Sequence, residues 1–163
     1  MSGPADYFTL HRRMSDTFQD CDIDTMAAHM QLTGWDPHIY LKICNRITSL
    51  VNDADSETIA LLANNMSKLA SNYYYMPKSD CVLFEIGVFF HAIKRYPQAL
   101  DYYKQAEAFI GDQFGLVYNT ALCLHHLEKN AEALTYFKRA EQLSPDSKET
   151  KEWIEYLEKP VAT

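Results

Sequence analysis

The chain has 163 residues, of which 47% are hydrophobic, so it can bury one domain core and is not wholly disordered. Its 22 acidic and 15 basic side chains give a formal charge of −7, a sign that repels phosphate backbones and excludes nucleic acid as an expected partner. Helix-forming residues fill long stretches and β-branched residues never alternate, which predicts an all-helical fold.

Residues 1–36 are expected to form an N-terminal helical arm, with one helix near 5–19 and a second near 23–33 that stops at Gly34. The first residues have no basic segment followed by an apolar one, which argues against a secretion signal. No apolar run approaches the roughly 20 residues that cross a bilayer, so membrane insertion is not expected.

The cysteines lie far apart and show no metal-ligand spacing. They are Cys21, Cys44, Cys81 and Cys123. Reduced thiols in a cytoplasmic protein are the simplest interpretation, and neither a structural metal nor a cofactor is expected.

Two helices are expected between residues 37 and 77. Asp36-Pro37 has the pattern of an N-cap followed by proline at the first helical position, which predicts a helix over 37–52. Asp55 and Ser56 can cap a second helix that runs to about residue 75, where Met76-Pro77 ends it. These two helices, over 37–77, resemble a degenerate copy of the helix pair that repeats further along the chain.

From residue 79 onward the residues that end one helix and begin the next occur at regular intervals. Four helices of similar length are expected, followed by a fifth, and they cover 80–94, 97–110, 114–128, 131–143 and 147–158. Two successive helix pairs of nearly equal size suggest an internal repeat.

Sliding the sequence against itself confirms the repeat, because the pattern Ala-x-x-x-aromatic-x-x-Ala occurs in both copies. The copies are Ala99, Tyr103 and Ala106, then Ala133, Phe137 and Ala140, with Gly87 and Ala121 matched at the same offset. Small residues let two antiparallel helices approach closely, and a large aromatic fills the space between one pair and the next. One pair cannot bury its own apolar face, so the pairs must stack.

The pattern and its period of about 34 residues resemble the tetratricopeptide repeat family. The resemblance implies a right-handed α-solenoid of stacked antiparallel helix pairs over 37–163. Its parts are the degenerate pair 37–77, repeats at 80–113 and 114–147, and a capping helix at 148–158 with Trp153, Ile154 and Leu157 facing inward. Thr120 departs from the leucine that is usual at its position.

In this family the first helix of each pair lines a concave groove, and the resemblance therefore implies a peptide-binding surface. The candidate residues are Cys81, Phe84, Val88, His91, Tyr118, Asn119, Leu122 and His125. Asn119 takes the position where related repeats present an amide to a ligand backbone. An alternative stays open, in which Phe84, Val88 and Leu122 pack against the N-terminal segment of the same chain.

Related repeats that grip the C-terminal carboxylate of chaperones use lysine, arginine and asparagine side chains. The corresponding residues here are Phe84, Val88, Asn119, Glu149 and Trp153. Only Asn119 matches and Glu149 has the opposite charge, so a carboxylate clamp is not expected.

Catalysis has little support, because no phosphate loop, nucleophile elbow or zinc-protease motif occurs. His91 and His125 repeat at one position, which favours a repeat-derived surface over a catalytic base or a metal pair. We therefore expect a non-catalytic adaptor or scaffold that binds a partner protein or peptide. Two alternatives are an accessory subunit that positions an enzyme and a dedicated secretion chaperone, since size and layout resemble class II type III secretion chaperones. Residues 1–36 are a candidate arm for homodimerisation or partner binding.

Overall fold

The structure is a computed structural model that describes residues 37–73 and 82–160. The predicted arm at 1–36, its suggested role in dimerisation and the helix end at Met76-Pro77 all lie outside the described residues. So does Cys81, one of the candidate binding residues.

The described residues form seven α-helices and one short 3-10 helix, with no strand among them. They are α3 (Pro37–Leu50), η2 (Val51–Asp53), α4 (Ser56–Tyr73), α5 (Val82–Ala92), α6 (Tyr96–Ile110), α7 (Phe114–His126), α8 (Asn130–Leu143) and α9 (Lys148–Glu158). The all-helical prediction is confirmed, and the helices begin and end within a few residues of the predicted positions.

Side-chain caps define where two of the helices begin. Asp55 accepts the backbone N–H of Thr58 at 2.8 Å, which caps α4 as the sequence suggested. Ser147 does the same for α9, where its hydroxyl accepts the backbone N–H of Thr150 at 3.3 Å. The capping bond lowers the pKa of the Asp55 carboxyl, because it stabilises the ionised form.

The turn inside each helix pair has the same geometry in both copies. Lys94 and Glu128, which occupy equivalent positions of the two copies, both adopt positive φ, at 62° and 61°. The following N–H groups reach back to close the helix: Arg95 to the carbonyl of Phe90 and Lys129 to that of Leu124, each at 2.9 Å. This is a Schellman motif, which lets the chain leave one helix and enter the next through a short turn.

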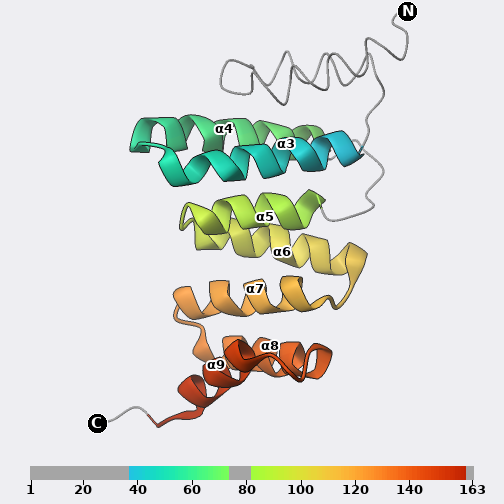
Figure 1. Ribbon diagram of the computed structural model, residues 1–163, viewed down its shortest axis with the longest axis vertical. Helices are drawn as coiled ribbons and strands as arrows, with labels where there is room; N and C mark the ends of the chain where they lie inside the picture. The colour runs from blue at the N-terminus through green and yellow to red at the C-terminus, as the bar shows by residue number, and fades with distance from the viewer. Residues whose placement is uncertain (1–36, 74–81, 161–163) are drawn as a thin grey trace, which may run out of the picture.

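The helix pairs α3–α4, α5–α6 and α7–α8 stack in chain order along the long axis of the molecule, with α9 beside the last pair (Figure 1). The closest packing joins α5 with α6 and α7 with α8, and further contacts between α6 and α7 and between α8 and α9 connect the layers. At the N-terminal end, α3 contributes more of the contact with α5 than α4 does.

The pairs approach closely because the residues at the crossing are small. Gly87 of α5 lies so near α6 that a Cβ at this position would be 2.5 Å from a ring carbon of Tyr103. Ala99 and Ala121 are fully buried at related crossing positions. Position 87 therefore requires glycine because a larger side chain would clash with Tyr103, and not because the helical backbone needs it.

The repeat positions form the core. Tyr103 and Phe137 are fully buried, and each belongs to one of two apolar clusters, the first spanning α3 to α7 and the second α7 to α9. Thr120, which replaces the usual leucine, is also buried, and its hydroxyl donates to the carbonyl of Leu116 at 2.7 Å. This bond satisfies the polar group that the substitution brings into the core.

Candidate functional site

A pocket of about 400 Å³ opens between α7 and α9. Its lining consists of aromatic and acidic side chains, namely Tyr118, His125, Glu149, Glu152, Trp153 and Tyr156. Such a combination of apolar walls and a few polar groups is typical of ligand-binding sites.

Helix periodicity explains why these six side chains face the same space. Tyr118 and His125 lie two turns apart on one face of α7. The four residues of α9 follow the spacing i, i+3, i+4, i+7, which also marks a single face. Thr150 and Ile154, on another face of α9, are buried and dock the helix onto the protein.

Trp153 forms the centre of the pocket wall. Its indole stacks on the buried ring of Phe137, with centroids 5.4 Å apart and planes 5° apart. His125 lies 4.8 Å from the indole centroid, and Tyr156 meets it edge-on at 5.8 Å. Contacts on several sides hold the indole in one orientation within the pocket wall.

The rim of the pocket is negatively charged. Glu149 and Glu152 are exposed, and within the described residues neither takes part in an ion pair. Burial raises the pKa of Tyr118, a hydrogen bond to Trp153 opposes that rise, and the two carboxylates add to it. The field inside the pocket therefore disfavours anions.

Of the predicted binding residues, Tyr118 and His125 line this pocket. Phe84 and Val88 lie half-buried against the first core cluster, and Leu122 lies half-buried against the second. These three thus pack on the protein's own core and present only part of their surface outward.

His91 and Asn119 are engaged with the hydroxyl of Tyr103. His91 Nδ1 lies 3.2 Å from this hydroxyl and 3.5 Å from Sγ of Cys123. Asn119 hydrogen-bonds to the same tyrosine and opposes the increase of its pKa that burial causes. These polar groups satisfy one another between the two repeats, so they hold the layers together.

The His91–Cys123 contact does not produce a reactive thiolate. Burial raises the pKa of the Cys123 thiol to about 12. Burial also lowers the pKa of His91, and the neighbouring His126 adds to this effect. Both groups are therefore neutral near pH 7, the opposite of the thiolate–imidazolium pair that nucleophilic catalysis requires.

Four pocket residues were not among the predicted site residues: Glu149, Glu152, Trp153 and Tyr156. They belong to α9, which the sequence marked as a cap. The repeat could have found them, because Trp153 and Tyr156 follow Asn119 and Leu122 by the same offset that relates the two copies.

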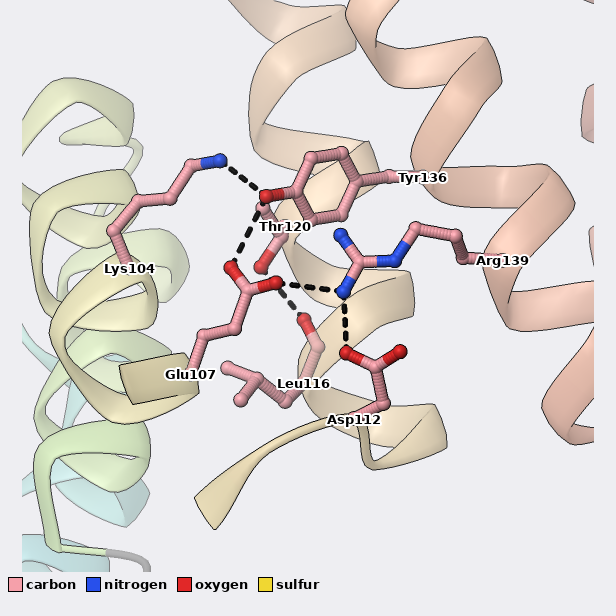
Figure 2. Close-up of polar contacts among 7 residues, drawn as sticks. All are labelled: Lys104, Glu107, Asp112, Leu116, Thr120, Tyr136 and Arg139. Carbon is pink, nitrogen blue, oxygen red and sulfur yellow. Dashed lines mark hydrogen bonds and ion pairs between the residues drawn. The ribbon is translucent and has the colours of Figure 1, made fainter. Parts of the chain in front are cut away.

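The second helices of the pairs carry a different polar cluster (Figure 2). Lys104 donates a hydrogen bond to the hydroxyl of Tyr136 in α8. Its Nζ lies 4.3 Å from the ring centroid of Tyr136, and the Arg139 guanidinium lies 4.5 Å from it. The Tyr136 hydroxyl donates to Glu107 at 3.1 Å, and Arg139 bonds both Glu107, at 2.6 Å, and Asp112. The cluster ties α8 to α6 and to the turn that follows α6.

The described part of the chain contains no cluster of three or more His, Cys, Asp or Glu side chains that could bind a metal ion. None of its helices combines the length and the apolar character that crossing a bilayer requires.

Stacked helix pairs with a repeated Schellman turn, small crossing residues and a buried aromatic between layers define a tetratricopeptide-like helical scaffold. The fold comparison agrees. A solved structure of the tetratricopeptide repeat protein MamA, named MamA AMB-1 P212121, matches with a TM-score of 0.61 and 13% sequence identity. The match covers 94% of this chain and 79% of that chain, and at this identity it shows the fold alone. No protein-family model and no curated protein sequence matches the chain.

Proposed function

We propose that the protein is a non-catalytic adaptor that binds a peptide segment of a partner protein on the face formed by α5, α7 and α9. The observation that carries the proposal is the aromatic pocket between α7 and α9, which is open and lies beside the 61%-exposed ring of Tyr156. An exposed aromatic next to a preformed pocket is typical of anchor sites for peptides.

The remaining chemistry fits a binding role. The neutral His91–Cys123 pair, in which only Cys123 is fully buried, lacks the charge state of a nucleophile. Cys44 and Cys123 are free thiols, which suits a reducing compartment such as the cytoplasm. A scaffold of this kind also suits a dedicated secretion chaperone or an accessory subunit of an enzyme, and the identity of the partner distinguishes these roles.

Site-specific photo-crosslinking tests the proposal in cells. A photoreactive phenylalanine analogue replaces Tyr156 in one variant and Gln142, an exposed residue of α8, in a control variant. We expect one partner, or a small set, to be linked at position 156 and not at 142. Mass spectrometry then separates a single secreted client from a stable assembly or an enzyme complex.

An affinity measurement with the linked partner completes the test. Tyr156→Ala removes an exposed ring, so the fold should remain intact while the partner binds about 2 kcal/mol more weakly, which is about 30-fold. Gln142→Ala should leave binding unchanged. Equal affinity of the Tyr156→Ala variant and the wild type would contradict the assignment of this face.

A further inference from the structure

The pocket between α7 and α9 brings together two features that attract the same class of ligand. Glu149 and Glu152 place two carboxylates on its rim, and their only hydrogen-bond contact among the described residues is from the Ser147 hydroxyl to Glu149, at 3.3 Å. Trp153 and Tyr156 add aromatic rings, whose faces carry partial negative charge. Both features favour a cation.

The chain already contains a filled example of this arrangement. On the opposite helices, the Arg139 guanidinium lies over the ring of Tyr136 at 4.5 Å and bonds the carboxylates of Glu107 and Asp112 (Figure 2). One aromatic face and two carboxylates thus hold one arginine. The pocket has the same components, aromatic faces and two carboxylates, and neither lysine nor arginine is among the described residues that line it.

The space also suits a long side chain. Trp153 has one face against Phe137, is also contacted by His125 and Tyr156, and lines the pocket with the surface that these rings leave open. Tyr156 is exposed at the edge of the pocket. The pocket volume of about 400 Å³ exceeds that of one amino-acid side chain, so a cationic group can enter with the apolar stem that carries it.

We propose that this pocket binds an arginine side chain of a partner peptide, an inference that rests on the proposed function. The guanidinium stacks on Trp153 or Tyr156 and donates to Glu149 and Glu152, while the aliphatic stem contacts the aromatic wall. Arginine fits better than lysine because its planar group stacks on rings and offers five donors in a fixed fork.

Nuclear magnetic resonance with short probes tests the proposal on the full chain. The probe is acetyl-Gly-Arg-Gly-amide, and the signal is the indole N–H of Trp153, identified by its loss in Trp153→Phe. We expect a saturable shift of this signal. The same peptide with citrulline, which is neutral and nearly the same shape, should bind at least fivefold more weakly, and so should the lysine peptide.

Matched variants separate the pocket from net charge. Glu149→Gln with Glu152→Gln should weaken the arginine probe at least fivefold. Glu132→Gln with Glu155→Gln removes the same charge at two exposed residues that do not line the pocket, and it should change binding little. Absence of saturable binding, equal binding of the citrulline or lysine peptide, or an unchanged double variant would each overturn the proposal.

Three further outcomes locate the error if the proposal fails. The sequence has a small basic cluster at His11-Arg12-Arg13. If Arg12→Gln with Arg13→Gln tightens probe binding, this cluster competes for the pocket, and assignment to a partner is overturned. If the probe fails to bind while Tyr156→Ala still weakens the crosslinked partner, the arginine specificity is wrong and the proposed function stands. If the probe binds but Tyr156→Ala leaves the affinity for the crosslinked partner unchanged, the proposed function is wrong instead.

Discussion

A methyl group at position 87 should destabilise the fold, although alanine is the best helix former. The added Cβ would lie 2.5 and 2.6 Å from two ring carbons of Tyr103 and 3.3 Å from the carbonyl oxygen of Ala99. Tyr103 is fully buried and packs against Phe84, with ring centroids 5.7 Å apart, so its ring cannot move aside cheaply.

The expected magnitude follows from two opposing effects. Overpacking a core costs about 1–3 kcal/mol, and a 2.5 Å contact with a buried ring belongs in the upper part of that range. Replacing a helical glycine by alanine also stabilises the helix by up to about 1 kcal/mol, because alanine has the higher helix propensity. We therefore expect Gly87→Ala to lose about 2 kcal/mol of unfolding free energy. For a chain of this size, that lowers the Tm by about 4–8 °C.

Urea unfolding followed by circular dichroism measures this loss, and Gly115→Ala supplies the control. Gly115 is exposed in α7, and its added Cβ would meet only Phe84, at 3.8 Å. That variant should be as stable as the wild type or up to about 1 kcal/mol more stable. If the two alanine variants change stability equally, the clash with Tyr103 is refuted. Tyr103→Leu should cost less in the Gly87→Ala background than alone, because it removes the clashing ring.

Three other variants and a pH titration test further features. Glu128→Gly should gain about 1 kcal/mol in urea unfolding, because glycine adopts the positive φ of this turn without strain. Arg139→Met keeps the apolar stem but loses the ion pair to Glu107, so it should cost about 1 kcal/mol in low salt and less in high salt. Ser147→Ala removes the cap of α9 and should cost about 1 kcal/mol in thermal unfolding. Burial raises the pKa of Cys123 from 9.0 to about 12, so the unfolded chain releases its proton first, and stability measured in urea should fall from pH 9 toward pH 12.

The fold was predictable from sequence because its main determinants are local and periodic. Ala99, Tyr103 and Ala106 recur one repeat later, and all six residues are buried as the repeat requires. The left-handed turns at Lys94 and Glu128 could not be predicted, since neither is glycine or asparagine. There the geometry comes from packing of the two helices, which overrides the local preference of the residue.

The candidate site was predictable only in part. Spacing predicted that Tyr118 and His125 share one face of a helix, and both line the pocket. It could not show that Asn119 and His91 contact the Tyr103 hydroxyl. Whether a half-buried side chain points outward or bonds a neighbour depends on rotamers and on the helix crossing, which spacing does not contain. The charged composition of α9 suggested a solvated capping helix. The face of α9 that lines the pocket and ends at Tyr156 was therefore not predicted.

The docking of α9 has a consequence for how binding would be detected. This helix is one whole wall of the pocket, yet it is anchored mainly on α8, with Thr150 and Ile154 as its buried residues. A wall held by so few contacts should open locally at a lower free energy than the α5–α6 layer. A ligand seated against Trp153 would hold the wall closed, so slower hydrogen exchange in α9 amides would report occupancy directly.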